Sequence, residues 1–180
     1  VRALAVDAQR KQLWVGTTVG ALQINIGDAD YNVLKTYTRK EGLANEYVFS
    51  ILSSAHGDIW LGTNGGGVSR FMDNQWKTYF PMHGLADYWV YSFAEAGRTL
   101  WIGTWAGLSR FDRDSGEFKT FIKELVNEWV YGLAVDKRGR LWIGTEGGMN
   151  MYDGDRWSVW THADGLGAAN DRQLPASGNT

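Results

Sequence analysis

The 180-residue chain contains no cysteine, only two prolines and no apolar run long enough to cross a membrane as a helix. Without cysteine it can form neither disulfide bonds nor thiolate metal sites. The N-terminal residues lack the charged and apolar regions of a signal peptide. Lysine and arginine are scattered and the formal net charge is −2, which disfavours binding driven by phosphate neutralisation. We therefore expect no nucleic-acid partner and no membrane insertion by this chain.

Tryptophan and glycine are abundant, and they recur in a fixed pattern. The chain has ten tryptophans and 23 glycines, and a five-residue phrase containing one of each occurs four times. The copies are Leu13–Thr17, Ile59–Thr63, Leu100–Thr104 and Leu141–Thr145, so their tryptophans are 46, 41 and 41 residues apart. Self-similarity at this period predicts one supersecondary unit repeated four times, with no separate second domain.

Each unit reads as four short strands separated by polar or glycine-rich turns. The first strands are expected at Arg2–Asp7, Val48–Ser53, Val90–Glu95 and Val130–Asp136, followed by the tryptophan strand, a third strand and an aromatic fourth strand. Four antiparallel strands in about 40 residues are typical of a propeller blade. The predicted fold is an all-β β-propeller with four four-stranded blades, at about residues 1–47, 48–89, 90–129 and 130–166. Residues 167–180 are expected to form a tail or linker.

The repeated tryptophans have a structural interpretation. On the second strand Trp14, Trp60, Trp101 and Trp142 are expected to lie between neighbouring blades. The glycine two residues later leaves room for the next sheet, and the following threonine can bond backbone at the strand end.

Three ways of closing the propeller ring are compatible with the sequence. Two uncovered end blades would expose more apolar surface than a monomer normally tolerates. The preferred solution is a homodimer in which two chains complete an eight-bladed ring. The alternatives are a segment of a larger single-chain ring and a compact four-bladed monomer.

The phrases Gly57–Phe71 and Gly139–Tyr152, with a third copy at Leu100–Asp112, resemble the two-component regulator propeller repeat. Gly-Leu pairs at 42–43, 84–85 and 165–166 match that family's blade junction. The resemblance implies a periplasmic or extracellular sensor propeller, often one that senses carbohydrate. The blades are also similar to those of streptogramin lyases, which implies a lyase-like enzyme as an alternative.

Propeller ligands normally bind where the blade-linking loops and the turns between second and third strands converge. The loops contribute Glu46, Tyr47, Trp89, Glu128 and Trp129, and the turns contribute Thr18, Asn64, Trp105 and Glu146. Aromatic faces beside amides and carboxylates suit sugar rings, and they equally suit packed loops. Trp105 is the strongest candidate because its equivalents are Thr18, Asn64 and Glu146, so the blade itself does not require an aromatic residue there.

Catalysis finds little support in the sequence. His83 and His162 fall in blade-linking loops, and His56 falls in a turn expected on the opposite face. No zinc-protease helix motif, nucleophile elbow or phosphate loop is present. Residues 112–117 resemble a calcium loop only loosely and predict a solvated turn. We expect a non-enzymatic ligand-binding module without a cofactor or metal. A structural assembly module is the alternative from another class.

Overall fold

The described part of the chain, residues 1–27 and 31–167 of a computed structural model, forms four separate four-stranded antiparallel sheets. Blade 1 contains β1 (Ala3–Asp7), β2 (Gln12–Thr17), β3 (Gly20–Asn25) and β4 (Asn32–Tyr37). Blade 2 contains β5 (Val48–Ser53), β6 (Ile59–Thr63), β7 (Val68–Met72) and β8 (Gln75–Tyr79). Blade 3 contains β9 (Val90–Ala96), β10 (Thr99–Thr104), β11 (Gly107–Asp112) and β12 (Phe118–Phe121). Blade 4 contains β13 (Val130–Val135), β14 (Leu141–Thr145), β15 (Gly148–Tyr152) and β16 (Trp157–Trp160).

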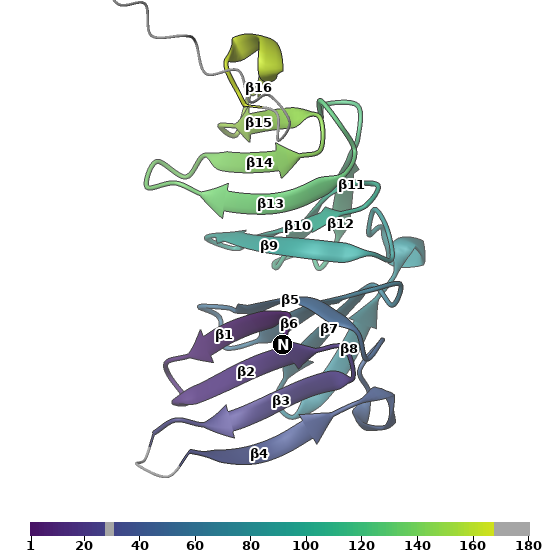
Figure 1. The fold of residues 1–180 in the computed structure, drawn as a ribbon, viewed down its shortest axis with the longest axis vertical. Coiled ribbons are helices and arrows are strands. Elements are labelled where there is room, and N and C mark those ends of the chain that lie inside the picture. The colour runs from purple at the N-terminus through teal and green to yellow at the C-terminus, as the bar shows by residue number, and fades with distance from the viewer. Residues whose placement is uncertain (28–30, 168–180) are drawn as a thin grey trace, which may run out of the picture.

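The first strands form the inner edge of an arc. Strand β1 contacts β5, β5 contacts β9, and β9 contacts β13. Blades 1 and 4 consequently lie at opposite ends of the molecule (Figure 1). The predicted all-β propeller of four four-stranded blades is confirmed, and these four blades form an arc. The predicted tail falls outside the described residues, apart from Gly167.

The core consists of blade-to-blade contacts centred on the repeated tryptophans. Trp14, Trp60 and Trp101 are each at most 5% exposed. Trp14 stacks on Tyr37 of its own blade and contacts Phe71 and Trp76 of blade 2. The same arrangement recurs at the next two interfaces, so large rings from two sheets pack together at each of them.

The glycine two residues after Trp14, Trp60 and Trp101 leaves space for a valine of the next blade. A Cβ added to Gly16, Gly62 or Gly103 would stand 2.6–2.7 Å from a valine Cγ1 of the following inner strand. Those valines, Val48, Val90 and Val130, are fully buried. No side chain larger than hydrogen fits the three glycine positions, which explains the fixed Trp-x-Gly spacing. Each phrase threonine donates to a backbone carbonyl across the adjacent turn, as expected.

A buried ion network joins blades 2 and 3. Asp58 Oδ2 accepts from Arg70 Nε at 2.6 Å and from Arg113 Nη1 at 2.8 Å. Arg113 also donates to Ser54 Oγ and lies 3.3 Å from Glu95. Burial of Asp58 raises the pKa of its carboxyl, but the hydrogen bond and charge of Arg113, with the charge of Arg70, lower it more. The net pKa lies below the ordinary value for aspartate.

Short 3₁₀ turns follow the fourth strands of blades 1, 2 and 4: η1 (Arg39–Glu41), η2 (Pro81–His83) and η3 (His162–Asp164). Gly42 and Gly84 end the first two turns with φ of 106° and 97°, a conformation that favours glycine. The leucine after each of these two glycines is buried, and this anchors the linker.

A buried polar residue on the third strand of each following blade then fixes the linker backbone. Ser69 Oγ accepts from Ala44 N at 2.9 Å, and Ser109 Oγ accepts from Ala86 N at 2.8 Å. The amide oxygen of Asn150 accepts from Val126 N at 3.0 Å. The loops that carry the candidate site residues are therefore held at fixed positions on the blades.

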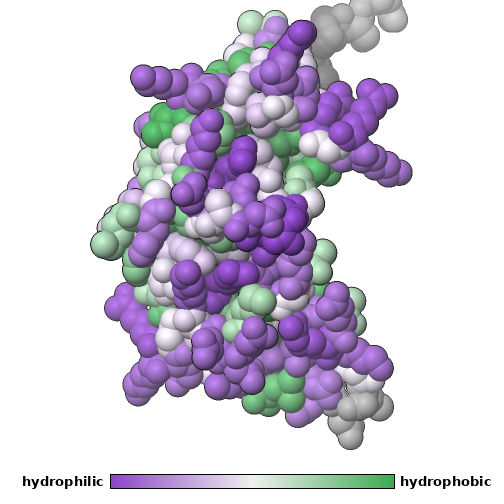
Figure 2. Space-filling model, turned by 180° about the vertical axis from the view of Figure 1, so that it is seen from behind, coloured by the Kyte–Doolittle hydropathy of each residue, from purple (hydrophilic) through white to green (hydrophobic). Residues whose placement is uncertain are grey.

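Seen from behind, the surface is mostly hydrophilic and its apolar patches are separated (Figure 2). One such patch lies at the lower end of that view, over blade 1.

Candidate functional site

The predicted loops and turns do converge, because backbone hydrogen bonds join them. Asn64 N donates to Tyr47 O, Trp105 N donates to Trp89 O, and Glu146 N donates to Trp129 O. Each turn between second and third strands thus contacts the loop that enters its own blade. An Asx turn shapes each loop, with Asn45, Asp87 and Asn127 accepting from the backbone N–H two residues later.

Three of the predicted aromatic residues form one cluster, Trp89, Trp105 and Trp129, called here the three-tryptophan cluster. The Trp105 and Trp129 rings stack at 4.4 Å with 29° between their planes. Trp89 meets Trp105 edge-on at 5.2 Å. Trp89 is 41% exposed and the other two are half-buried, so indole surface from two blades faces solvent at one place.

A second group of rings, absent from the sequence-based prediction, extends this cluster along the inner edge of the arc. The Phe49 and Tyr91 rings lie 5.0 Å apart and the Tyr91 and Tyr131 rings 5.3 Å apart, while Tyr91 also contacts Trp105. We call Phe49, Tyr91 and Tyr131 the inner-edge row. The signal in the sequence is an aromatic residue between a valine and a small residue at the start of three inner strands.

The same position in blade 1 holds Arg2. Its guanidinium carbon lies 5.7 Å from the Tyr47 ring centroid and 5.6 Å from that of Phe49. Tyr47 in turn contacts Phe49 edge-on. Tyr47 therefore belongs to the blade 1 end of the inner-edge row and is separate from the three-tryptophan cluster.

Beside the cluster lies an open hollow of about 220 Å³, lined by Asp87, Tyr88, Trp89 and Trp105. Burial, with the nearby Tyr131 and Asp87, raises the pKa of the Tyr91 phenol, so the phenol stays protonated and can donate a hydrogen bond. Glu128 and Glu146 are exposed on the adjoining loop and turn. The hollow thus combines two indole rings with the carboxylate of Asp87 and the phenol of Tyr88.

The remaining predicted site residues lie elsewhere. Thr18 is exposed on the blade 1 turn, and Glu46 lies near η1, where its carboxylate accepts from Arg39 N at 3.5 Å. Asn64 is held by its backbone N–H at the blade 2 turn. The structure therefore brings Trp89, Trp105 and Trp129 together and leaves Thr18, Glu46 and Asn64 on the blades before them.

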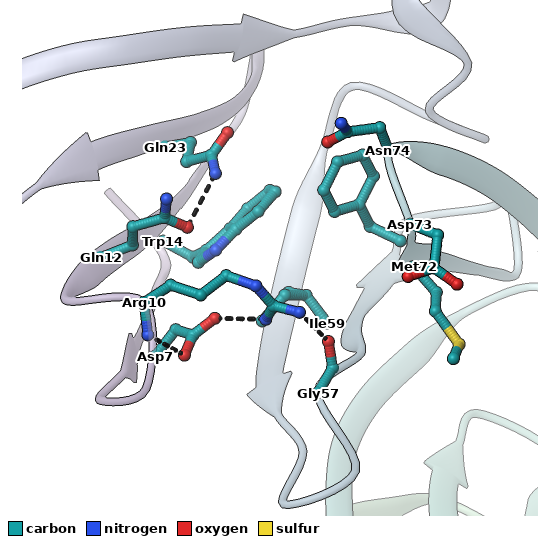
Figure 3. Close-up of a pocket in the computed structure, with 11 residues that line it drawn as sticks. Asp7, Arg10, Gln12, Trp14, Gln23, Gly57, Ile59, Met72, Asp73 and Asn74 are labelled. Carbon is teal, nitrogen blue, oxygen red and sulfur yellow. Dashed lines mark hydrogen bonds and ion pairs between the residues drawn. The ribbon is translucent and has the colours of Figure 1, made fainter.

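A second pocket, of about 260 Å³, opens between blades 1 and 2 (Figure 3). Arg10 bonds there to Asp7 and to Gly57 O, and Gln23 donates to Gln12. Asp73 and Asn74 form its opposite side (Figure 3). Between blades 2 and 3 the position of Asp73 is occupied by Arg113, which fills the equivalent space. The pocket thus lies at the position where the next interface has the longer Arg113, bonded to Asp58 and Ser54.

The three histidines lie in different turns, and each ring already has a partner. His56 Nε2 lies 2.9 Å from Gly97 O, and His162 Nδ1 lies 3.0 Å from Leu166 O. His83 Nδ1 accepts from Phe80 N, the capping role that Glu41 has in η1 and Asp164 has in η3.

Within residues 1–27 and 31–167, no three histidine, aspartate or glutamate side chains are grouped so that they could hold a metal ion. In the same described part, no helix has both the length and the apolarity needed to span a bilayer.

The fold is similar to that of several solved propellers. The extracellular domain of the hybrid two-component system BT3049 from B. thetaiotaomicron aligns over 92% of this chain and 23% of its own, with 24% identity and a TM-score of 0.83. This chain thus spans about a quarter of that domain. Virginiamycin B lyase from Staphylococcus aureus aligns over 89% of this chain and 55% of its own, with 12% identity and a TM-score of 0.67. The computationally designed protein Ika4 aligns over 89% of both chains, with 14% identity and a TM-score of 0.63.

At the level of sequence, no curated protein matches the chain significantly. The model of the two-component regulator propeller matches residues 42–65 and 124–147. Both stretches run from a blade-linking loop through an inner strand and the tryptophan strand to the next turn. Residues 42–65 and 124–147 therefore match the two-component regulator propeller repeat, and both stretches lie in blades of a β-propeller.

Proposed function

We propose that this chain is a non-enzymatic sensor module that binds a carbohydrate, or a similar polar ligand, on the three-tryptophan cluster. The observation that carries the proposal is the position of Trp105. The equivalent residues of the other blades are Thr18, Asn64 and Glu146, so the blade does not need an indole there. Trp105 nevertheless lies between Trp89 and Trp129 with part of its surface exposed.

The chemistry of the cluster supports a neutral ligand with many hydroxyl groups. The C–H faces of a sugar ring pack on indole, and hydroxyl groups at its edge pair with carboxylates and phenols. Asp87 lines the hollow, and Glu128 and Glu146 adjoin the cluster. Three carboxylates around the rings disfavour an anionic ligand, because burying like charges together is costly.

The arrangement of the histidines favours binding over catalysis. Each histidine lies in its own turn and is bonded to backbone, and none belongs to the cluster. Similarity to streptogramin-type lyases rests on the shared fold. Similarity to the extracellular domain of BT3049, together with the regulator repeats, supports a periplasmic or extracellular location and a sensing role as part of a longer protein.

The test is a calorimetric titration of the chain with a panel of neutral oligosaccharides of different linkage. We expect saturable binding of at least one, and a loss of at least about tenfold in affinity for Trp105→Ala, because an indole that stacks on a bound ring contributes a large share of the binding energy. Tyr31→Ala is the matched control, since Tyr31 is an exposed aromatic residue on blade 1, away from the cluster. Affinity that is unchanged in Trp105→Ala, or a panel in which nothing binds, would contradict the proposal.

A further inference from the structure

The two ends of the arc carry uncovered apolar faces. Residues opposite each other in an antiparallel pair share a face. Leu4, Val6, Leu13, Ile24 and Val33 therefore lie on the face of blade 1 that points away from Trp14 and blade 2, called the blade 1 end face. Leu4, Val6 and Val33 are each more than half exposed.

At the other end, Trp142, Gly144, Met149, Met151 and Trp160 share the face of blade 4 that points away from blade 3, called the blade 4 end face. Trp142 and Trp160 are only half-buried. The tryptophans equivalent to Trp142, which are Trp14, Trp60 and Trp101, are almost fully buried.

At the internal interfaces a valine of one blade, the knob, fills the space beside a glycine of the preceding blade, the hole. This contact is incomplete at both ends of the arc. Gly144 occupies the position of Gly16, Gly62 and Gly103, but a Cβ built there would meet only Gly132 O, at 3.7 Å. Val1 occupies the position of the buried Val48, Val90 and Val130, yet it is 82% exposed. The hole on blade 4 and the knob on blade 1 are the two halves of one such contact.

Side-chain sizes on the two end faces compensate each other. Internal interfaces pair a tyrosine or phenylalanine beside the tryptophan with two aromatic residues of the next blade, such as Tyr37 against Phe71 and Trp76. The blade 4 end face has the larger Trp160 in the place of Tyr37. The blade 1 end face has the smaller Ile24 and Val33 in the places of Phe71 and Trp76. A larger residue on one face thus accompanies smaller residues on the other.

Two cross-strand positions that carry cations at internal interfaces are neutral on the blade 4 end face, where the charged neighbours of Trp142 are Arg140 and Asp136 of its own blade. Beside Trp60 and Trp101 stand Arg70 with Lys77 and Arg110 with Lys119, whereas beside Trp142 stand Met151 and Ser158. We propose that the blade 4 end face binds the blade 1 end face of a second copy of this chain, and that two copies close an eight-bladed ring.

The number of copies follows from the fold. Propellers of four-stranded blades typically close with about four to eight blades. These four blades do not close on one another, because blades 1 and 4 lie at opposite ends of the molecule (Figure 1). The next multiple of four is a ring of eight, in which a two-fold axis makes the two contacts identical. Leu22 of blade 1 stands where Ser69, Ser109 and Asn150 stand in the other blades, so each of the two contacts would lack the linker hydrogen bond.

The test is the mass of the 180-residue chain by light scattering over a dilution series. The proposal predicts twice the chain mass of 20.2 kDa at high concentration. Gly144→Ala should shift the mass to that of one chain, because its methyl group occupies the hole while touching nothing close within its own chain. Leu4→Asp, which places a charge on the blade 1 end face, should do the same. Met82→Asp is the matched control, since Met82 is 85% exposed on η2 and away from both end faces.

Near-ultraviolet circular dichroism checks that every variant keeps its fold. A mass of one chain at every concentration would overturn the proposal, and so would a mass above two chains. Persistence of the dimer in both Gly144→Ala and Leu4→Asp would show that another surface joins the copies. The proposal depends on the end faces alone, so failure of carbohydrate binding would leave it standing.

Discussion

At the scale of single residues, Asp58 is the buried charge that links blades 2 and 3. Its side chain is fully buried and bonded to two arginines, one of which, Arg113, has a side chain only 4% exposed. Both guanidinium carbons also lie within 6 Å of the Trp60 ring centroid. Removal of one charge from such a group leaves the others buried and poorly paired, which costs more than the pair itself contributes.

Asp58→Asn should therefore lower the free energy of unfolding by about 3 kcal/mol, because it leaves buried arginine charge without its carboxylate. Asp114→Asn is the matched control, since Asp114 and its partner Arg98 are exposed and such pairs contribute at most about 1 kcal/mol. Urea unfolding at neutral pH measures both losses. Equal losses in the two variants would contradict the structural role assigned to Asp58.

The Asp58 carboxylate and its arginine partners also make the free energy of unfolding depend on pH. The folded-state pKa of Asp58 is lowered, so its contribution is fully present above the unfolded pKa of about 4 and is lost as pH falls through the folded pKa. The stability difference between wild type and Asp58→Asn should accordingly shrink as the pH falls below about 4. A difference that stays constant down to the acid unfolding transition would argue against this assignment.

At the scale of elements, the linkers decide where the aromatic residues lie. Ser109 on β11 accepts the backbone N–H of Ala86, and the following residues of that linker carry Trp89. Since Ser109 is fully buried, no water replaces this bond when the hydroxyl is removed. The polar residue on the third strand thus connects blade packing to the position of the candidate site.

Ser109→Ala should lower the free energy of unfolding by about 1–3 kcal/mol, because the Ala86 N–H stays buried without a partner. It should also weaken oligosaccharide binding, since the loop that carries Trp89 loses its anchor. Ser69→Ala is the matched control, because it removes the same bond at the blade 2 linker, which does not carry the cluster. A comparable loss of affinity in Ser69→Ala would contradict the role of the Ser109 bond in positioning Trp89.

Most elements could be predicted from sequence, because each repeat restates the same period-2 pattern and the same glycine turns. The Trp-x-Gly-Thr phrase predicts the ring between blades and the space beside the glycine, and the structure shows that a valine of the next blade fills this space. The inner-edge row could not be predicted in this way, because Phe49, Tyr91 and Tyr131 occupy irregular positions in the strand pairing, where simple alternation fails. The Asp58 network was equally hidden, since Arg113 is separated from Asp58 by more than a repeat.

At the scale of the whole molecule, the arc has two kinds of surface. The loops and turns at one side present the three-tryptophan cluster, and the sheet faces at the two ends present unfilled halves of a blade contact. The number of repeats predicted the uncovered end faces, because in a row of four blades the first and the last each have only one neighbouring blade. Which aromatic residues come together could not be predicted in the same way, because that depends on how neighbouring blades are rotated relative to each other.

The most direct test of this account is a nuclear magnetic resonance titration that follows the ten indole N–H signals, assigned by single substitutions, as a neutral oligosaccharide is added. Saturable shifts are predicted for Trp105 and its neighbours Trp89 and Trp129. The signals of Trp14, Trp60 and Trp101, which lie between blades, should not move. Saturable binding that leaves the Trp89, Trp105 and Trp129 signals unchanged, or that shifts the buried indoles instead, would contradict the account.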